Sequence, residues 1–390
     1  MIGCTKLLCG TATISEVIKH RDGQLPPQLL QFSDSLRPLV VWNMTNRCNL
    51  RCIHCYIKAE DTEYQNELST DEAVTMIDDL AAMKCPVLLF SGGEPLLRPD
   101  LFELGRYADQ RGLRCVISSN GTLIDDAAAQ KIKAAGFQYV GISIDGAPAT
   151  HDHFRAQTGA FEKALAGIHA CQRNGVKTGM RFTVNRINHQ DLPKIFDIIE
   201  RERVPRFCMY HLVYAGRGAG LIAEDTGAEL KREILDYVID KTQDFHRRGI
   251  EVEILTTDNH ADGIYLYNHI MQNDPARADE VVNLLQMHGG CSAGTKFANV
   301  DPQGNVHPCQ FWQDYSVGNV RERPFSEIWT SDDPLMVKLR NKSQHLKGKC
   351  GSCNYKELCG GCRIRARAAH DDLWAEDPAC YLRAEELGTV

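Results

Sequence analysis

Short apolar runs alternate with longer amphipathic segments over the first half of the chain. The apolar runs cover residues 39–44, 87–90, 115–118, 139–144, 180–184 and 207–213. Segments with helical spacing lie between them, at residues 73–83, 100–111, 125–135, 160–174 and 191–202. The first of these follows a Ser69-Thr-Asp-Glu72 capping box. Short strands that alternate with helices of this length predict βα units and a parallel sheet.

Six such units are too few for the closed eight-stranded TIM barrel. The pattern therefore predicts an α/β fold with a partial (β/α)6 TIM-like barrel over residues 38–215. Residues 1–37 form an N-terminal extension without a strong period, apart from a short amphipathic piece at 29–32. Residues 216–285 have a charged, helical pattern and are expected to bridge to a small cysteine-rich domain at 286–390.

Composition and charge exclude several classes of protein. The net charge of −7 gives no reason to expect a nucleic-acid partner. No apolar run approaches the roughly 18 residues that span a bilayer, and the first residues lack the plan of a signal peptide. We therefore expect a cytoplasmic protein without a membrane partner.

The chain contains sixteen cysteines, which is unusual for a cytoplasmic protein of otherwise ordinary composition. The cytosol keeps thiols reduced, so disulfides are not expected. Three cysteines lie within residues 48–55 and seven within 291–380, which indicates metal ligation. Four others lie in apolar segments, where a free thiol behaves as a small buried hydrophobe: Cys85, Cys115, Cys171 and Cys208. The pattern assigns no role to Cys4 or Cys9.

The first cysteine group follows the first predicted strand and has the spacing Cys48-x3-Cys52-x2-Cys55. Thiolates are the usual ligands of iron–sulfur clusters, and three of them leave the fourth iron of a 4Fe–4S cluster open to a small molecule. A three-ligand zinc site or three unrelated thiols are the alternatives. The spacing favours the cluster.

Small polar residues follow several of the other predicted strands. The second strand ends in Gly92-Gly93-Glu94-Pro95, where two glycines allow a close backbone approach and Glu94 can accept from an ammonium group. The other strand-end candidates are Ser119, Asn120, Ser143, Asp145 and Arg181. Each suits contact with a ribose or a carboxylate, and each is equally compatible with an ordinary turn. Active sites of parallel α/β folds lie at this edge.

The C-terminal cysteines have a regular spacing. Cys291-x12-Gly304-x4-Cys309 is followed by Cys350-x2-Cys353-x5-Cys359-x2-Cys362 and then by Cys380. Two C-x2-C pairs are typical of zinc or iron–sulfur sites. A structural zinc ribbon is therefore the alternative to a cluster here.

Taken together, the Cys48–Cys55 motif and the Gly92–Pro95 motif resemble the radical AdoMet (radical SAM) superfamily, and the C-terminal spacing resembles the SPASM domain. The resemblance implies S-adenosyl-L-methionine, an AdoMet-binding 4Fe–4S cluster and one or two auxiliary 4Fe–4S clusters. It implies that Gly92–Pro95 binds the amino group of AdoMet. The residues that it places around AdoMet are His54, Ser119, Asn120, Ser143, Asp145 and Arg181.

The same resemblance divides the C-terminal cysteines into two sets. Cys350, Cys353, Cys359 and Cys380 would form a complete four-thiolate site, and Cys291, Cys309 and Cys362 would form the other. The chain departs from the family at this second set. Two residues instead of three precede Cys362, and no further cysteine follows closely after Cys291. The second site would be three-coordinate, use His307 or His288, or be empty.

A narrower resemblance concerns the substrate. Residues 1–10, 25–32, 40–44 and 207–218 are similar to the radical AdoMet enzymes of the alternative, siroheme-dependent haem pathway. This implies an iron tetrapyrrole substrate, with removal of two acetate groups from didecarboxysiroheme, and a low-potential electron donor such as flavodoxin or ferredoxin. The alternatives are another step on a related tetrapyrrole, a peptide-modifying SPASM enzyme, and a non-catalytic electron-transfer or scaffold protein.

A substrate with several carboxylates would need guanidinium partners, because arginine binds carboxylates bidentately. The candidates near strand ends are Arg155, Arg181, Arg206 and Arg217. Tyr210, His211 and Tyr214 are candidates for proton transfer or for packing on a flat macrocycle. A solvated arginine or a packed aromatic ring is the alternative for each.

Overall fold

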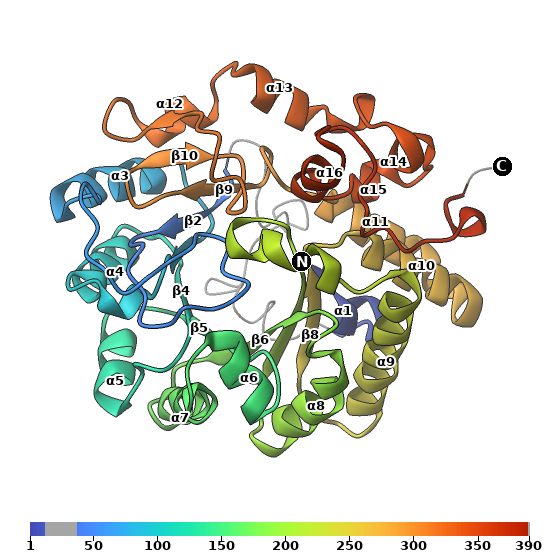
Figure 1. Ribbon diagram of the computed structural model, residues 1–390, viewed down its shortest axis with the longest axis horizontal. Coiled ribbons are helices and arrows are strands. Elements are labelled where there is room, and N and C mark those ends of the chain that lie inside the picture. Colours follow the sequence, from blue (N-terminus) through green and yellow to red (C-terminus); the bar gives the residue numbers. More distant parts are fainter. Residues whose placement is uncertain (12–36, 389–390) are drawn as a thin grey trace.

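The computed structural model describes residues 1–11 and 37–388. The expected piece at 29–32 and the motif at 25–32 lie outside these residues. A single curved sheet has the strand order β1-β8-β7-β6-β5-β4-β3-β2-β9-β10-β11, and helices surround its outer face (Figure 1). Neighbouring strands from β2 to β8 are all parallel. The predicted α/β, TIM-like architecture is confirmed.

The strands and helices of the barrel keep close to their predicted positions. The strands are β2 (Leu39–Asn43), β3 (Leu88–Ser91), β4 (Cys115–Ser119), β5 (Tyr139–Ser143), β6 (Thr178–Val184), β7 (Arg206–His211) and β8 (Glu253–Thr257). The helices are α3 (Thr70–Ala82), α4 (Leu101–Gln110), α5 (Asp126–Ala134), α6 (Pro148–Arg155), α7 (Ala160–Arg173), α8 (Leu192–Arg201), α9 (Ala228–Arg247), α10 (Ala261–Asn273) and α11 (Ala278–His288). The capping box is present before α3: Ser69 accepts from the amide of Glu72, and the Glu72 side chain accepts from the amide of Ser69.

The structure adds two elements that the sequence pattern did not predict, β8 and α6. Residues 216–285 are mostly helical, as expected, but they also contain β8, which lies between α9 and α10 and extends the parallel sheet beside β7. The six predicted strands are present as β2–β7, and β8 adds a further parallel strand beside them. The helix α6 was also not expected. It begins with Pro148 and is only 8 residues long, too short to show a clear helical period.

The N- and C-terminal parts of the chain complete the sheet at its two ends. At one end β1 (Ile2–Gly3) pairs antiparallel with β8, and α1 (Cys4–Cys9) follows it. At the other end β9 (Phe297–Val300) pairs parallel with β2, followed by β10 (Asn305–His307) and β11 (Gly318–Asn319). The remaining helices are α12 (Phe325–Trp329), α13 (Pro334–Arg340), α14 (Gly348–Ser352), α15 (Lys356–Cys359) and α16 (Arg363–His370).

Side-chain alternation along the strands separates the helix-facing core from the inner face of the sheet. In β7, Phe207 and Met209 are fully buried, and Phe207 packs on Phe196 of α8 at a ring distance of 5.2 Å. Cys208 and Tyr210 therefore point to the opposite, inner face. In the portion of the chain that the structure describes, no helix is both long enough and apolar enough to cross a bilayer.

Candidate functional site

The first cysteine group lies in the loop after β2, at the carboxyl edge of the sheet. Cys48 and Cys52 are buried, and Cys55 is partly exposed. Burial raises the pKa of Cys48 to about 12, and the neighbouring charges of Glu94, Cys52 and Cys55 add to this effect. The three thiols are thus close enough to influence one another. Iron binding stabilises thiolates at such positions, and the donor set fits a cluster with three protein ligands.

The Gly92-Gly93 turn packs directly on this loop. The Gly93 amide donates to the Thr45 carbonyl at 2.7 Å, and the Glu94 amide donates to the Arg47 carbonyl at 2.8 Å. A Cβ atom on Gly93 would lie 2.1 Å from the Arg47 carbonyl oxygen. Gly92 has a φ of +133°, which L-residues rarely adopt. Glycine is required at both positions because two backbone segments touch there.

Glu94 joins the ends of β3 and β4. Its carboxylate accepts from the Ser119 hydroxyl at 2.9 Å and from the Asn120 amide at 2.8 Å. The side chain is fully buried. Burial raises the pKa of Glu94 to about 7, against the lowering effect of these hydrogen bonds. A carboxylate offers about four acceptor positions, so Glu94 retains capacity for a ligand amine.

Asn120 connects β4 to the cysteine loop. Its Nδ2 donates to Asn49 Oδ1 at 2.9 Å and lies 3.9 Å from the Cys48 sulfur. Ser119 and Asn120 therefore lie beside the cysteine loop, and their predicted contact with AdoMet stays a prediction. Ser143 lies further round the edge, opposite Arg181 in the β5–β6 register.

Asp145 and Arg155 form a buried ion pair behind the same loop. Asp145 follows β5, and Arg155 is the last residue of α6; the two side chains are 1% and 8% exposed. Arg155 also donates to the Cys52 sulfur at 3.4 Å. Burial acts to raise the pKa of Asp145, but the charges of Arg155 and His54 outweigh it, and the pKa lies below its ordinary value. The pair contacts a candidate cluster ligand and is not open to a substrate carboxylate.

His54 is the third member of this buried group. Its Nε2 lies 3.7 Å from Asp145 Oδ2. Burial lowers the pKa of His54 to about 4, although Asp145 opposes the shift. The ring is therefore neutral near pH 7. Its Nδ1 is buried and has no hydrogen-bond partner among the described residues.

Arg217 also has a different position from the one expected of a substrate-binding residue. Its Nε donates to the Cys52 carbonyl at 2.7 Å, and both Nη atoms lie 3.1 Å from the Ala59 carbonyl. Its amide donates to the Cys55 carbonyl at 2.8 Å. These bonds hold the shape of the cysteine loop and occupy the guanidinium group.

His211 and Tyr210 lie on opposite faces of β7. His211 is an even number of residues from Phe207 and Met209 along β7, so its side chain lies on the same, helix-facing side of the strand. Its Nε2 lies 2.8 Å from Asp262 Oδ2 in α10. Asp262 also accepts from the Tyr381 hydroxyl at 2.8 Å. This places His211 in the helix-facing layer, which does not favour a role in substrate proton transfer.

Tyr210 points to the inner face, where its neighbour Arg181 donates to the Ser118 hydroxyl. Burial raises the pKa of Tyr210 above its ordinary value, although Arg181 opposes this. Tyr214 donates to Asp225 at 2.6 Å. Of the candidate aromatic residues, Tyr210 is the one that shares the inner face with Arg181.

The C-terminal cysteines lie in two groups. Cys350, Cys353, Cys359 and Cys380 line one cavity, together with Gly360 and Gly361. Burial raises the pKa of Cys309 well above its ordinary value, and the charges of Cys291 and Cys362 add to this, so these three are also neighbours. A four-thiol cavity and a separate three-thiol group fit the two expected cluster sites. Across residues 1–11 and 37–388, no three His, Cys, Asp or Glu side chains are grouped as ligands of a single metal ion.

The two histidines considered for the three-cysteine group are already engaged. His307 contacts the Tyr315 carbonyl at 2.7 Å through Nδ1 and Asp301 at 3.3 Å through Nε2. The Nε2 of His288 lies 2.9 Å from the amino group of Met1. Both ring nitrogens of His307 are thus occupied, which does not favour it as a fourth ligand. Nδ1 of His288, by contrast, is buried and has no hydrogen-bond partner among the described residues. Cys85, Cys115, Cys171 and Cys208 are buried, as predicted.

Comparisons with known proteins agree with this geometry. Residues 42–199 match the Radical SAM superfamily, and residues 291–354 match the SPASM iron–sulfur cluster-binding domain. The protein is thus a radical SAM enzyme, and its cofactors are AdoMet and 4Fe–4S clusters.

Relatives are similar over the whole chain. Fe-coproporphyrin III synthase of Methanosarcina barkeri is 51% identical over 395 residues, which cover 100% of this chain and 99% of the relative. Pre-heme d1 synthase of Dinoroseobacter shibae is 43% identical, covering 94% of this chain and 91% of the relative. The chain therefore belongs to the family of radical SAM enzymes that includes these two synthases.

The solved structure of Streptococcus suis SuiB bound to S-adenosylmethionine has a TM-score of 0.70 at 18% identity, covering 89% of this chain and 78% of SuiB. At this identity the likeness concerns the fold alone.

Proposed function

We propose that this chain is an Fe-coproporphyrin III synthase, which removes two acetate side chains from didecarboxysiroheme. The observation that carries the proposal is the 51% identity to that enzyme along the full length of both chains. The region compared spans the whole chain, so it includes both the Cys48–Cys55 loop and the C-terminal cysteine groups. We further propose a cytoplasmic location, where sixteen thiols stay reduced, and a low-potential donor such as flavodoxin or ferredoxin.

The proposed roles follow from the contacts of the residues. Cys48, Cys52 and Cys55 would hold three irons of a cluster, which together with AdoMet supplies a carbon radical able to abstract hydrogen. Glu94 would accept a hydrogen bond from the amino group of AdoMet. Arg155 fixes Cys52 through its bond to sulfur.

Two residues on the inner face are proposed to contact the tetrapyrrole. Arg181 lies on this face and is not paired with a carboxylate in the described hydrogen bonds and ion pairs, so it can bind a propionate or acetate group. Tyr210 lies on the neighbouring strand in register with Thr183 and presents a protonated hydroxyl. The C-terminal cysteine groups would hold the auxiliary clusters, which would supply an electron acceptor for the reaction.

The mass of the product tests this proposal. The reconstituted enzyme is incubated anaerobically with AdoMet and reductant, with didecarboxysiroheme or Fe-coproporphyrin III as substrate. We expect the first to lose two acetates and the second to stay unchanged. Decarboxylation of the second would make the enzyme a haem synthase instead. Cleavage of AdoMet without change in either compound would overturn the tetrapyrrole assignment.

The buried carboxylate of Glu94 predicts a pH-dependent affinity for AdoMet. The ionised form accepts hydrogen bonds from the amino group, and its pKa is about 7. One pH unit below that value only about a tenth of the carboxylate is ionised, so we expect binding to weaken by about tenfold from pH 8 to pH 6. Equilibrium dialysis with labelled AdoMet measures this. In Glu94→Gln, binding should be weaker and this pH dependence should disappear; an unchanged pH profile would contradict the role.

A further inference from the structure

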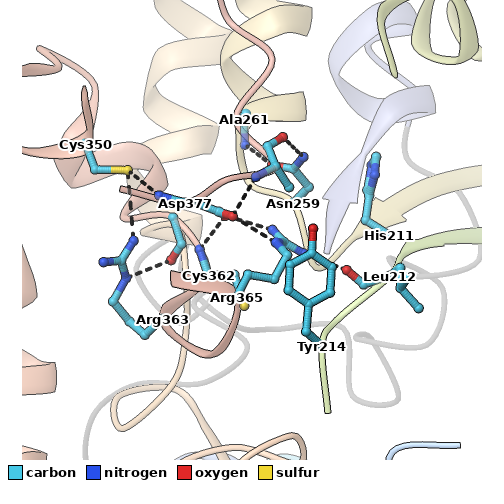
Figure 2. Close-up of polar contacts among 12 residues, drawn as sticks. His211, Leu212, Tyr214, Asn259, Ala261, Cys350, Cys362, Arg363, Arg365 and Asp377 are labelled. Carbon is cyan, nitrogen blue, oxygen red and sulfur yellow. Dashed lines mark hydrogen bonds and ion pairs between the residues drawn. The ribbon is translucent and has the colours of Figure 1, made fainter. Parts of the chain in front are cut away.

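Arg365 and Asp377 form a buried ion pair in the C-terminal domain (Figure 2). Nε of Arg365 donates to Oδ1 of Asp377 at 2.9 Å, and Nη2 donates to Oδ2 at 2.8 Å. The residues are 0% and 4% exposed. Removing two charges from water costs more than their attraction returns unless further hydrogen bonds complete the arrangement. The other partners of the pair therefore indicate what it does.

Asp377 contacts ligands of both cysteine groups (Figure 2). Its Oδ2 accepts from the amide of Cys362 at 2.7 Å, and its own amide donates to the Cys350 sulfur at 3.3 Å. Its carbonyl accepts from the amide of Cys380 at 3.1 Å. Cys362 belongs to the three-cysteine group, whereas Cys350 and Cys380 belong to the four-cysteine group. Asp377 therefore contacts at least one cysteine of each group.

Arg365 connects this residue to the barrel. Its Nη1 donates to the Leu212 carbonyl at 3.2 Å, directly after the end of β7. Its charge also acts on Cys362. The guanidinium group therefore lies between the strand that carries Tyr210 and the two cysteine groups.

We propose that Asp377, held by Arg365, is a positioning residue shared by the two auxiliary clusters and sets their reduction potentials together. Hydrogen bonds to ligand sulfurs and the charges around a cluster tune its potential. Reduction adds negative charge, which a nearby carboxylate opposes and a nearby guanidinium favours. Because Asp377 touches both groups, a change in it acts on both clusters.

Redox titration followed by electron paramagnetic resonance tests this. The parent is the reconstituted full chain with Cys48, Cys52 and Cys55 replaced by alanine, so that only the auxiliary signals remain. In Asp377→Asn we expect both midpoint potentials to shift to more positive values, and in Arg365→Gln to more negative values. In the double variant Asp377→Asn/Arg365→Gln, both midpoint potentials should return toward those of the parent protein. Asp372→Asn removes a carboxylate from the partly exposed pair with Lys347, and should move neither potential.

Iron content and thermal unfolding of each variant distinguish a change in reduction potential from loss of a cluster or of the fold. A fully loaded Asp377→Asn protein in which only one potential moves, or neither, overturns the proposal. If that variant loses iron, Arg365→Lys takes its place, because it keeps the charge but cannot bridge both carboxylate oxygens and Leu212. There too both potentials should move in the same direction, and independent movement overturns the proposal.

This inference rests on the cluster sites of the proposed function. The titration uses neither AdoMet nor a tetrapyrrole, so a failure of acetate removal and a failure of shared tuning are distinguishable.

Discussion

Replacing Cys52 by alanine is expected to abolish AdoMet cleavage, whereas replacing Cys353 is expected to leave cleavage intact and stop tetrapyrrole turnover. Cys52 belongs to the loop beside Glu94, and its sulfur accepts from Arg155 at 3.4 Å. Cys353 lines the separate cavity of the four-cysteine group. The two substitutions remove one thiolate each from sites with different proposed roles.

The measurement compares 5′-deoxyadenosine with tetrapyrrole product in the same anaerobic reaction. For Cys52→Ala both should fall to background. For Cys353→Ala the deoxyadenosine should persist while the product is lost. Cys171→Ala is the matched control, because Cys171 is buried in α7 away from both groups and should retain both activities. Full turnover by a correctly folded Cys353→Ala protein would exclude an essential role for the auxiliary site.

The strands and the AdoMet-side motifs were predictable because their signals are local. Each strand from β2 to β7 is a short apolar run next to a helical period, and the turn after β3 shows its two glycines directly in the sequence. Glycine is required at these two positions because the turn packs against the backbone of residues 45–47, which lie on another loop. The sequence therefore shows that two glycines follow β3, but only the structure shows that a close backbone contact requires them.

The strand β8 was not predicted from the sequence because it includes polar residues and does not form a purely apolar run. Glu253 begins the strand and is buried, and the register places it opposite Arg206, with which it forms an ion pair at 3.3 Å. A buried glutamate of this kind looks solvent-exposed in the sequence, since acidic residues are seldom buried without a partner. The partner lies on a neighbouring strand, 47 positions away in the chain, where local patterns give no sign of it.

The candidate arginines illustrate a second limit. Arg155, Arg181 and Arg217 all lie near the cysteine loop or the inner face, as proximity to strand ends suggested. Only the fold shows that Arg155 is neutralised by Asp145 and that Arg217 is bound to backbone carbonyls. Sequence can place a guanidinium group near a site, but whether it is free depends on acceptors from distant segments. Asp377 and Arg365 were missed for the same reason, although each lies three residues from a motif cysteine.

Breaking the buried Asp145–Arg155 pair is expected to destabilise the barrel strongly. Arg155→Gln leaves the carboxylate of Asp145 buried and without its charged partner, which typically costs about 3–5 kcal/mol. The amide of Thr183, at 2.7 Å, and His54 are the contacts that stay with the carboxylate. Urea unfolding of the protein before cluster reconstitution measures the loss without a contribution from bound iron.

The double variant Arg155→Gln/Asp145→Asn separates this cost from simple loss of packing. An uncharged amide at 145 can still accept from Thr183, so we expect the double variant to recover most of the stability lost in Arg155→Gln. If the two single losses were simply additive, the pair would not be acting as a unit. The recovered protein would still lack the bond from Arg155 to the Cys52 sulfur. Its cluster should therefore show an altered potential at near-normal stability, which would identify Arg155 as a positioning residue for the AdoMet-binding cluster.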